Sequence, residues 1–278
     1  MIKEQTFAVP ERSDIRLGHK VEVGDISCYW FEMNHSGECP RQLLELFNIY
    51  LNRYNWDKLI RPGCTVIDIG GHSGDTAVPM QFLSRGTVLS VEPNPGIKKY
   101  LDYCCEQNSH LGKFVTAHEA VTTVDMDAVE ILDHNNALCN GGLIDPTWTE
   151  ALQQRMIGIA VNKITVPGLT LEHLLEKYLT PEEINNIGFI KTDTEGHDKS
   201  ILESSKDLIN RIKPIIFTEW FFAYTETESQ DLFRVIEELN YLPFYPETLK
   251  PATVNQRSED LVLIHKDKVE EFFKNVNL

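Results

Sequence analysis

The amino-acid sequence predicts an α/β fold, in which a doubly wound and mostly parallel sheet is covered by helices on both faces. Two observations support this prediction. From Cys64 onward, short apolar strands alternate with amphipathic helices, the order that places parallel strands in one sheet. Near the end, the runs "YLPFY" and "DLVLIH" follow each other without a helix between them, which predicts an antiparallel hairpin at the sheet edge.

The elements can be assigned in order along the chain. Weak alternation in "HKVEVGDISCYWFEM" predicts a small strand pair, and residues 41–55 carry apolar side chains at helical spacing. Residues 1–60 are therefore expected to form an N-terminal extension, and residues 61–278 the main domain. In that domain we expect strands at 65–69, 87–92, 114–121, 187–193 and 214–219, with helices at 75–84, 96–107, 170–178, 198–211 and 226–239. Pro79 is expected to kink or interrupt its helix, residues 122–163 are less regular, and a short helix follows the last strand.

Composition limits the classes of partner. The formal charge of −16 and the lack of a basic cluster argue against nucleic-acid binding, which needs a stripe of Lys and Arg. No apolar run reaches 18 residues and the start lacks a signal-peptide core, so we expect a cytoplasmic protein without a membrane partner. The six cysteines lack zinc-ligand spacing and are expected to be reduced and mostly buried, with Cys139 the exposed one.

The first motif is a glycine turn in "TVIDIGGHSGD", residues 65–75. An apolar strand with Asp68 near its end runs into Gly70, Gly71, His72 and Gly74. A strand that enters a glycine turn before a helix is where α/β sheets hold nucleotide-like ligands, because glycine lets ligand atoms approach the backbone. The alternative is a tight turn without a ligand.

The next strand favours an adenosine ligand. "GTVLSVEPNP" places Glu92 at a strand end, where an acid accepts hydrogen bonds from both ribose hydroxyls, and Pro93 and Asn94 shape the turn that follows. Asp68 would lie close to the linker region of the ligand. Its carboxylate would repel a dinucleotide pyrophosphate and attract the ammonium and sulfonium of S-adenosylmethionine. A methyl donor is therefore the preferred ligand.

The second motif, "IGFIKTDTEGHDKSIL", crowds four ionisable groups after an apolar strand. Asp193, Glu195, His197 and Asp198 fall at the carboxyl end of the fourth strand, the rim where open parallel sheets bind ligands. Capping of the next helix explains one acid, for instance Asp198, but not all four groups.

With these motifs in place, the chain resembles the FkbM-type, S-adenosylmethionine-dependent methyltransferases. The matching segments cover about 64–265 and are "VIDIGGHSGDT", "VLSVEPNP", "VPGLTLEHLL", "FIKTDTEGHDKSIL", "KPIIFTEW" and "EDLVLIHK". The segment "KTDTEGHD" stands where the family usually shows Lys-Ile-Asp-Val-Glu-Gly and then an acid. The sequence departs from the family at Gly71-His72, where Ala-Asn is favoured, and at His197-Asp198, where a small residue and Glu are usual.

The resemblance implies a class I methyltransferase (Rossmann-like) fold with an antiparallel last strand, and S-adenosylmethionine as cofactor. It also implies methyl transfer to an oxygen, typically a hydroxyl of a sugar or a natural-product scaffold. If that layout holds, the expected cofactor-binding residues are Asp68, Gly70, Gly71, His72, Gly74, Glu92, Pro93, Asn94, Glu119, Ala120 and Asp193. Glu119 and Ala120 would end the third strand beside the adenine.

The expected catalytic residues are Asp193, Glu195 and His197, any of which could take the proton of an acceptor hydroxyl. The alternatives are that Asp193 faces the donor, that Glu195 fixes the turn and that His197 faces solvent. Glu219, which closes the fifth strand, could pair with Asp193 as a metal ligand. The next residue is Trp220 instead of a third ligand, so no metal is expected.

Acceptor specificity is expected from the irregular stretches "HNNALCNGG" and "WTEALQQRM", because loops at strand ends carry it. Asn135, Asn136 and Asn140 could bind a polyol or simply form turns. Two other functions stay open: a nicotinamide-dependent oxidoreductase on a related fold, and a non-catalytic protein that binds the donor. The expected partner is a small hydroxylated acceptor.

Overall fold

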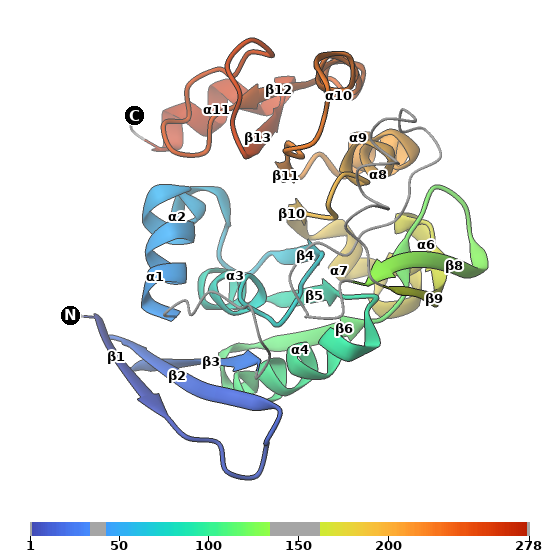
Figure 1. The fold of residues 1–278 in the computed structure, drawn as a ribbon. Coiled ribbons are helices and arrows are strands. Elements are labelled where there is room, and N and C mark those ends of the chain that lie inside the picture. The colour runs from blue at the N-terminus through green and yellow to red at the C-terminus, as the bar shows by residue number, and fades with distance from the viewer. Residues whose placement is uncertain (1, 34–42, 134–161, 277–278) are drawn as a thin grey trace.

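A seven-stranded sheet forms the centre of the chain in a computed structural model, which describes residues 2–33, 43–133 and 162–276 (Figure 1). The strand order is β12-β13-β11-β10-β4-β5-β6. The five strands from β6 to β11 in this order are parallel, whereas β13 runs antiparallel to both β11 and β12. This topology confirms the doubly wound sheet and the antiparallel hairpin. The strands are β4 (Thr65–Ile69), β5 (Thr87–Val91), β6 (Lys113–Ala117), β10 (Ile187–Thr192), β11 (Ile215–Glu219), β12 (Tyr241–Phe244) and β13 (Asp260–His265).

Helices cover both faces of this sheet, because neighbouring residues on each central strand point to opposite sides. Ile67 belongs to one buried cluster, which includes residues of α6, α8, α9 and α10. Val66 belongs to another, which includes residues of α2, α3 and α4. The helices of the main domain are α2 (Trp56–Leu59), α3 (Ala77–Ser84), α4 (Pro95–Gln107), η2 (Ser109–Leu111), α6 (Leu171–Tyr178), α7 (Pro181–Asn185), α8 (Asp198–Ser204), α9 (Lys206–Ile212), α10 (Glu226–Glu238) and α11 (Lys266–Val276).

A separate three-stranded sheet opens the chain. The predicted strand pair is confirmed as β2 (Ile15–Val23) and β3 (Ile26–Met33), and β1 (Ile2–Phe7) adds a third strand. A third buried cluster includes Phe31 of this sheet together with Val78 of α3 and Cys104 of α4. The sheet therefore packs on the main domain (Figure 1). The boundary at residue 60 stays a prediction.

Between residues 41 and 55 the helix is not uniform. A single α-helical turn, α1 (Leu43–Phe47), leads into a π-helix, η1 (Asn48–Arg53). Such wide turns are rare and occur frequently at functional sites. The helical spacing predicted a helix correctly but not its type.

The predicted strand 114–121 is wrong, because the chain leaves the central sheet after Ala117. Ala120 and Val121 form β7, which pairs with β9 (Asn162–Leu169) in a small sheet of order β7-β9-β8. The third strand of this sheet is β8 (Met126–Asp133), which lies in the stretch that the sequence showed only as less regular. Glu119 lies at this break, where its buried carboxylate accepts hydrogen bonds from Lys177 and Tyr178 of α6.

Two helices also differ from prediction. The helix expected to be kinked at Pro79 instead begins at Ala77, so Pro79 lies in the first turn, where a missing N–H costs nothing. The helix expected at 198–211 is divided at Ser205 into α8 and α9. Cys28, Cys64, Cys104 and Cys105 are buried and free, as expected. Cys139 lies outside the described residues.

Every described helix is too short or too polar to cross a bilayer.

Candidate functional site

The glycine turn joins β4 to α3, and the chain packs tightly around it. Gly70 has a φ of +81°, and a Cβ there would lie 1.9 Å from the carbonyl oxygen of Asp193. A Cβ on Gly71 would lie 1.9 Å from Ser90 Oγ. The N–H of Gly74 closes the turn on the carbonyl of Gly71 at 2.9 Å. Neighbouring protein atoms therefore already require glycine here, apart from any ligand.

Asp68 lies beneath this turn and is fully buried. Its Oδ2 accepts hydrogen bonds from the hydroxyls of Thr76, at 2.9 Å, and Ser90, at 2.8 Å. Its Oδ1 lies 3.3 Å from the ammonium of Lys191. The carboxylate of Asp68 thus stabilises the glycine turn through the residues that pack against it. Direct contact with a bound donor stays a prediction.

Lys191, which the sequence reasoning did not select, connects the two motifs. Its side chain is 2% exposed and its Nζ donates to the carbonyl of Gly70 at 2.9 Å. The same Nζ lies 3.4 Å from Asp193 Oδ2. Burial alone would lower the pKa of Lys191, but the carboxylates of Asp193 and Asp68 outweigh it and raise the pKa above its usual value. A lysine inside an apolar strand was the signal in the sequence, because a buried ammonium requires partners.

Glu92 lies just after β5, buried, with each carboxylate oxygen bound to one backbone N–H. Oε2 accepts from His72 at 3.1 Å and Oε1 from Asn94 at 2.8 Å. Burial raises the pKa of Glu92, although His72 and the two N–H groups act against it. The side chain of Asn94 caps α4 by accepting a hydrogen bond from the N–H of Gly96, at 2.9 Å. Pro93 lies between the two accepting residues, Glu92 and Asn94.

These residues fit an adenosine ligand. A carboxylate offers about four acceptor sites, and Glu92 uses one on each oxygen, so two remain for ribose hydroxyls. The turn and Glu92 lie at the carboxyl ends of adjacent parallel strands, β4 and β5. His72 adopts a φ of +43°, which is uncommon for a residue with a side chain, and its imidazole is partly exposed at the turn.

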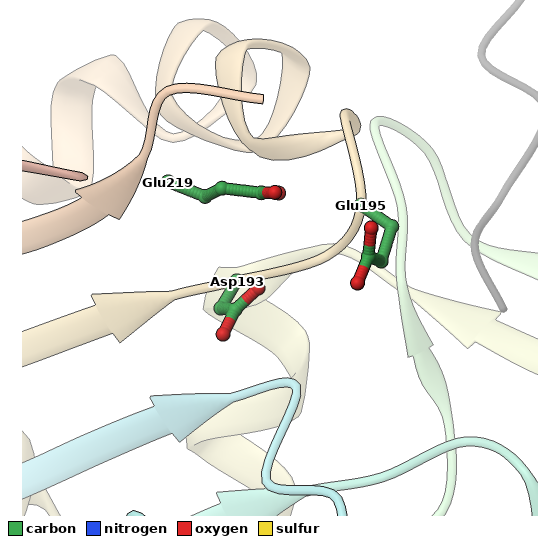
Figure 2. Close-up of side chains that lie close together, drawn as sticks. All are labelled: Asp193, Glu195 and Glu219. Carbon is green, nitrogen blue, oxygen red and sulfur yellow. The ribbon is translucent and has the colours of Figure 1, made fainter. Parts of the chain in front are cut away.

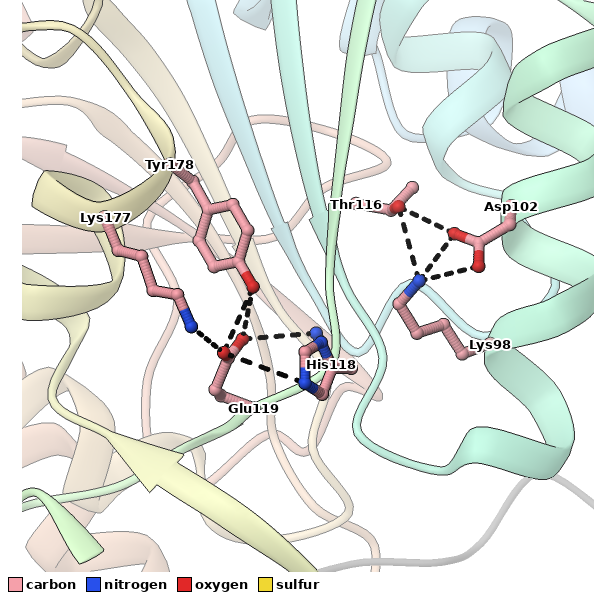
Figure 3. A network of polar contacts seen from close by, with 7 residues as sticks. All are labelled: Lys98, Asp102, Thr116, His118, Glu119, Lys177 and Tyr178. Atoms are coloured by element: carbon pink, nitrogen blue, oxygen red, sulfur yellow. Dashed lines mark hydrogen bonds and ion pairs between the residues drawn. The ribbon is translucent and has the colours of Figure 1, made fainter. Parts of the chain in front are cut away.

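Glu119 and Ala120 lie at the corner between β6 and β7, and both are buried. Glu119 accepts hydrogen bonds from Lys177 Nζ, at 2.5 Å, and from the hydroxyl of Tyr178, at 2.9 and 3.1 Å (Figure 3). Burial would raise the pKa of Glu119, but these hydrogen bonds outweigh it and lower the pKa. The carboxylate therefore ties α6 to the end of the parallel strands. A role beside the adenine stays a prediction.

The acidic turn after β10 separates into two groups. Asp198 is fully buried and accepts from the N–H groups of Thr194, at 3.3 Å, and Gly196, at 3.4 Å, so it shapes the turn. His197 is 4% exposed at the start of α8. The solvent-facing interpretation of His197 is therefore wrong. Its role as a base stays a prediction.

The second group consists of Asp193 and Glu195 from this turn and Glu219 from the end of β11. One ligand atom of each lies within 4.8 Å of the others, and the three carboxylates face a common space (Figure 2). Burial, followed by the negative charges of Asp193 and Asp198, raises the pKa of Glu195 to about 8. Burial and the same two charges raise the pKa of Glu219 well above its usual value.

A cleft of about 310 Å³ opens beside Asp193. Its walls include Tyr50 of the π-helix and the following Tyr54, together with Phe217 of β11 and the acid Asp260 of β13. The sequence did not predict that residues 45–54 would reach the site. The stretches expected to select the acceptor, "HNNALCNGG" and "WTEALQQRM", with Asn135, Asn136 and Asn140, lie outside the described residues.

Comparison with solved structures gives weak likenesses. A methyltransferase FkbM from Methylobacillus flagellatus is 12% identical with a TM-score of 0.45, and the alignment covers 80% of this chain and 53% of that one. An S-adenosylmethionine-dependent O-methyltransferase from Thermotoga maritima is 11% identical with a TM-score of 0.38, and the alignment covers 88% of this chain and 77% of that one. A 16S rRNA methyltransferase from T. thermophilus, in complex with AdoMet and guanosine, is 13% identical with a TM-score of 0.41. That alignment covers 94% of this chain and 50% of the other. This chain thus spans about half the length of the M. flagellatus protein, and at these TM-scores the likenesses carry no argument.

No curated protein matches the chain. The family comparison is decisive instead. The model of the methyltransferase FkbM domain matches residues 68–243, which is more than half of the chain and includes both motifs. The strand order described above is the class I methyltransferase fold that the resemblance implied. The chain belongs to the FkbM methyltransferase family.

Proposed function

We propose that the protein transfers a methyl group to a hydroxyl of a small acceptor, such as a sugar or a natural-product scaffold. One observation carries the proposal: Asp193 lines the 310 Å³ cleft and also contacts the glycine turn through its backbone. A hydroxyl seated in the cleft would thus meet a carboxylate at the place where the donor site begins.

The donor would be held by the glycine turn and by Glu92, with Asn94 fixing the loop that carries them. S-adenosylmethionine supplies a methyl carbon that bonds to the acceptor oxygen, while the electron pair of the broken carbon–sulfur bond stays on sulfur. Because such a displacement needs an aligned oxygen, positioning by rigid residues supplies much of the rate. The packed turn around Gly70 and Lys191 offers that rigidity.

The hydroxyl proton must go to a base within hydrogen-bond reach. Asp193 is the best placed of the three predicted residues, because its side chain is 43% exposed and lines the cleft. Glu195 lies beside it and could receive the proton in turn. His197 is buried at the start of α8, which makes it the least accessible of the three.

The walls of the cleft support a hydroxylated acceptor. Tyr50 and Tyr54 offer ring faces, and the carboxylates of Glu45, Glu259 and Asp260 accept hydrogen bonds from hydroxyl groups. Burial and the charge of Asp193 raise the pKa of Asp260 to about 8, so at neutral pH its carboxyl group can also donate. The chain's charge of −16 disfavours an RNA acceptor.

The first test is calorimetry with S-adenosylmethionine and S-adenosylhomocysteine on the wild type, Glu92→Gln and Glu92→Ala. We expect micromolar binding that Gln weakens and Ala abolishes. Radiolabelled donor would then be screened against sugars, hydroxylated metabolites and RNA. Absence of donor binding refutes the proposal. Donor binding without transfer to any acceptor would indicate a non-catalytic protein, and label in RNA would exclude the small-molecule acceptor.

A further inference from the structure

The three carboxylates of Asp193, Glu195 and Glu219 form an arrangement that methyl transfer alone does not require. They come from two adjacent strand ends, and one oxygen of each lies within 4.8 Å of the others (Figure 2). Carboxylates at such distances repel one another when they are ionised, and Asp198 lies close enough to add to that repulsion. This repulsion is relieved when one of the carboxylates takes up a proton or when a cation binds between them.

The described part of the chain does not supply such positive charge in full. Lys191 contacts Asp193, at 3.4 Å, but no described basic residue forms an ion pair with Glu195 or Glu219. Glu219 is the clearest case, because its Oε2 is buried and accepts no hydrogen bond from any described residue. Buried carboxylate oxygens normally have partners, so an unpaired one turned toward two other carboxylates indicates a missing ligand.

We propose that Asp193, Glu195 and Glu219 bind a divalent cation that prefers oxygen ligands, such as Mg²⁺ or Mn²⁺. All three ligands are carboxylates, and hard cations of this kind bind carboxylates and water, whereas zinc sites use mainly Cys and His. Three protein ligands leave coordination positions open. Asp193 also lines the cleft, so those positions face the place of the acceptor.

The sequence predicted no metal here, because Trp220 follows Glu219 where a third ligand was sought. In the structure Trp220 is buried and its Nε1 donates to Ser229 Oγ at 3.0 Å, so its side chain packs in the core and holds α10. Glu195 takes the place of that third ligand. Its backbone has a φ of +58°, and the turn that follows β10 brings it opposite Glu219.

The cation's role rests on the proposed function, although its binding does not. A divalent cation that holds the acceptor oxygen lowers the pKa of that hydroxyl, so the proton leaves more easily to a nearby base. An acceptor with two adjacent hydroxyls could occupy two open positions. Selection for vicinal diols, as in sugars, would follow.

The test is Mn²⁺ titration of the chelator-treated full chain, without donor or acceptor, with free Mn²⁺ followed by electron paramagnetic resonance. We expect one Mn²⁺ per chain in the wild type, displaced by Mg²⁺. Glu219→Gln and Glu195→Gln should each weaken the affinity by about tenfold or more, because ligand charge sets affinity. The matched control is Glu176→Gln, an exposed acid on α6, which should leave the affinity unchanged.

Binding of S-adenosylhomocysteine to the same samples separates this proposal from the proposed function and shows that each variant is folded. Wild-type protein that binds S-adenosylhomocysteine but not Mn²⁺ overturns the cation site and leaves methyl transfer standing. Equal Mn²⁺ affinity in the wild type and in both folded variants also overturns it. Mn²⁺ binding that depends on Glu219, without binding of S-adenosylhomocysteine, would support the cation site while refuting the donor site.

Discussion

Replacement of Lys191 by methionine tests how the two motifs are held together. The substitution keeps the length of the side chain and removes the ammonium that lies 3.3 Å from Asp68 and 3.4 Å from Asp193. At an effective dielectric constant of about 20, a pair at this distance is worth about 5 kcal/mol before desolvation. Breaking a buried pair by removing one partner costs about 3–5 kcal/mol. Because Asp68 keeps two hydroxyl donors, we expect the lower part of that range, about 3–4 kcal/mol.

The assay is urea unfolding of Lys191→Met, with thermal unfolding as a second readout. A loss of this size lowers the melting temperature by roughly 6–15 °C in a domain of this length. Adding Asp68→Asn should recover about 1–3 kcal/mol, because it removes the uncompensated charge. The control is Lys266→Met, an exposed lysine that should change stability by less than about 0.5 kcal/mol. A cost below about 1 kcal/mol for Lys191→Met, or no recovery in the double variant, would refute the reasoning.

Three further predictions concern stability. Gly71→Ala should lower the free energy of unfolding in urea by about 1–3 kcal/mol, because its Cβ would lie 1.9 Å from Ser90 Oγ. In a protein that already carries Ser90→Ala, the same substitution should cost less. Tyr178→Phe should cost about 1–2 kcal/mol, because it removes a hydroxyl donor from the buried carboxylate of Glu119. Glu183→Gln should cost about 1–2 kcal/mol at pH 7, since hydrogen bonds from Lys113 and the Thr180 backbone lower the pKa of Glu183 from 4.5 to about 2.

Each has an opposing outcome. For Gly71→Ala, strictly additive costs with Ser90→Ala would show that the hydroxyl is not the obstacle. For Tyr178→Phe, an unchanged unfolding free energy would mean that Glu119 is satisfied without the phenol. For Glu183→Gln, a folded-state pKa below the unfolded one makes the contribution full above pH 4.5 and lost as the pH falls through 2. A gap from wild type that stays constant between pH 7 and pH 2.5 contradicts that assignment.

Local signals in the sequence were sufficient to locate the central sheet, the glycine turn and Glu92. The apolar run of β4 ends at a glycine turn, and Glu92 follows the apolar run of β5, so both positions could be located from neighbours in the chain. The antiparallel hairpin followed from the missing helix between β12 and β13. These features depend on periodicity and turn residues over fewer than about twenty residues.

Features that depend on distant contacts were missed. The cleft needs Tyr50 to meet Asp193, two residues far apart in sequence that packing brings together. Glu219 was weighed as a metal ligand with an expected partner at the next position, whereas the third carboxylate of the cluster is that of Glu195, in the turn after β10. The break after Ala117 was also missed, because the partners of the buried Glu119 beside it lie on α6, more than fifty residues later.

The N-terminal sheet has a practical consequence for anyone who wishes to shorten this protein. Trp30 donates through Nε1 to Ser73 Oγ in the glycine turn, at 3.2 Å, and Phe31 belongs to the cluster that also contains Val78 and Cys104. A version that starts at residue 61 would expose this apolar surface to water and lose a hydrogen bond to the glycine turn. Such a fragment should aggregate on expression and bind S-adenosylhomocysteine weakly. Any fusion protein or chimera that contains this domain should therefore keep the first sixty residues.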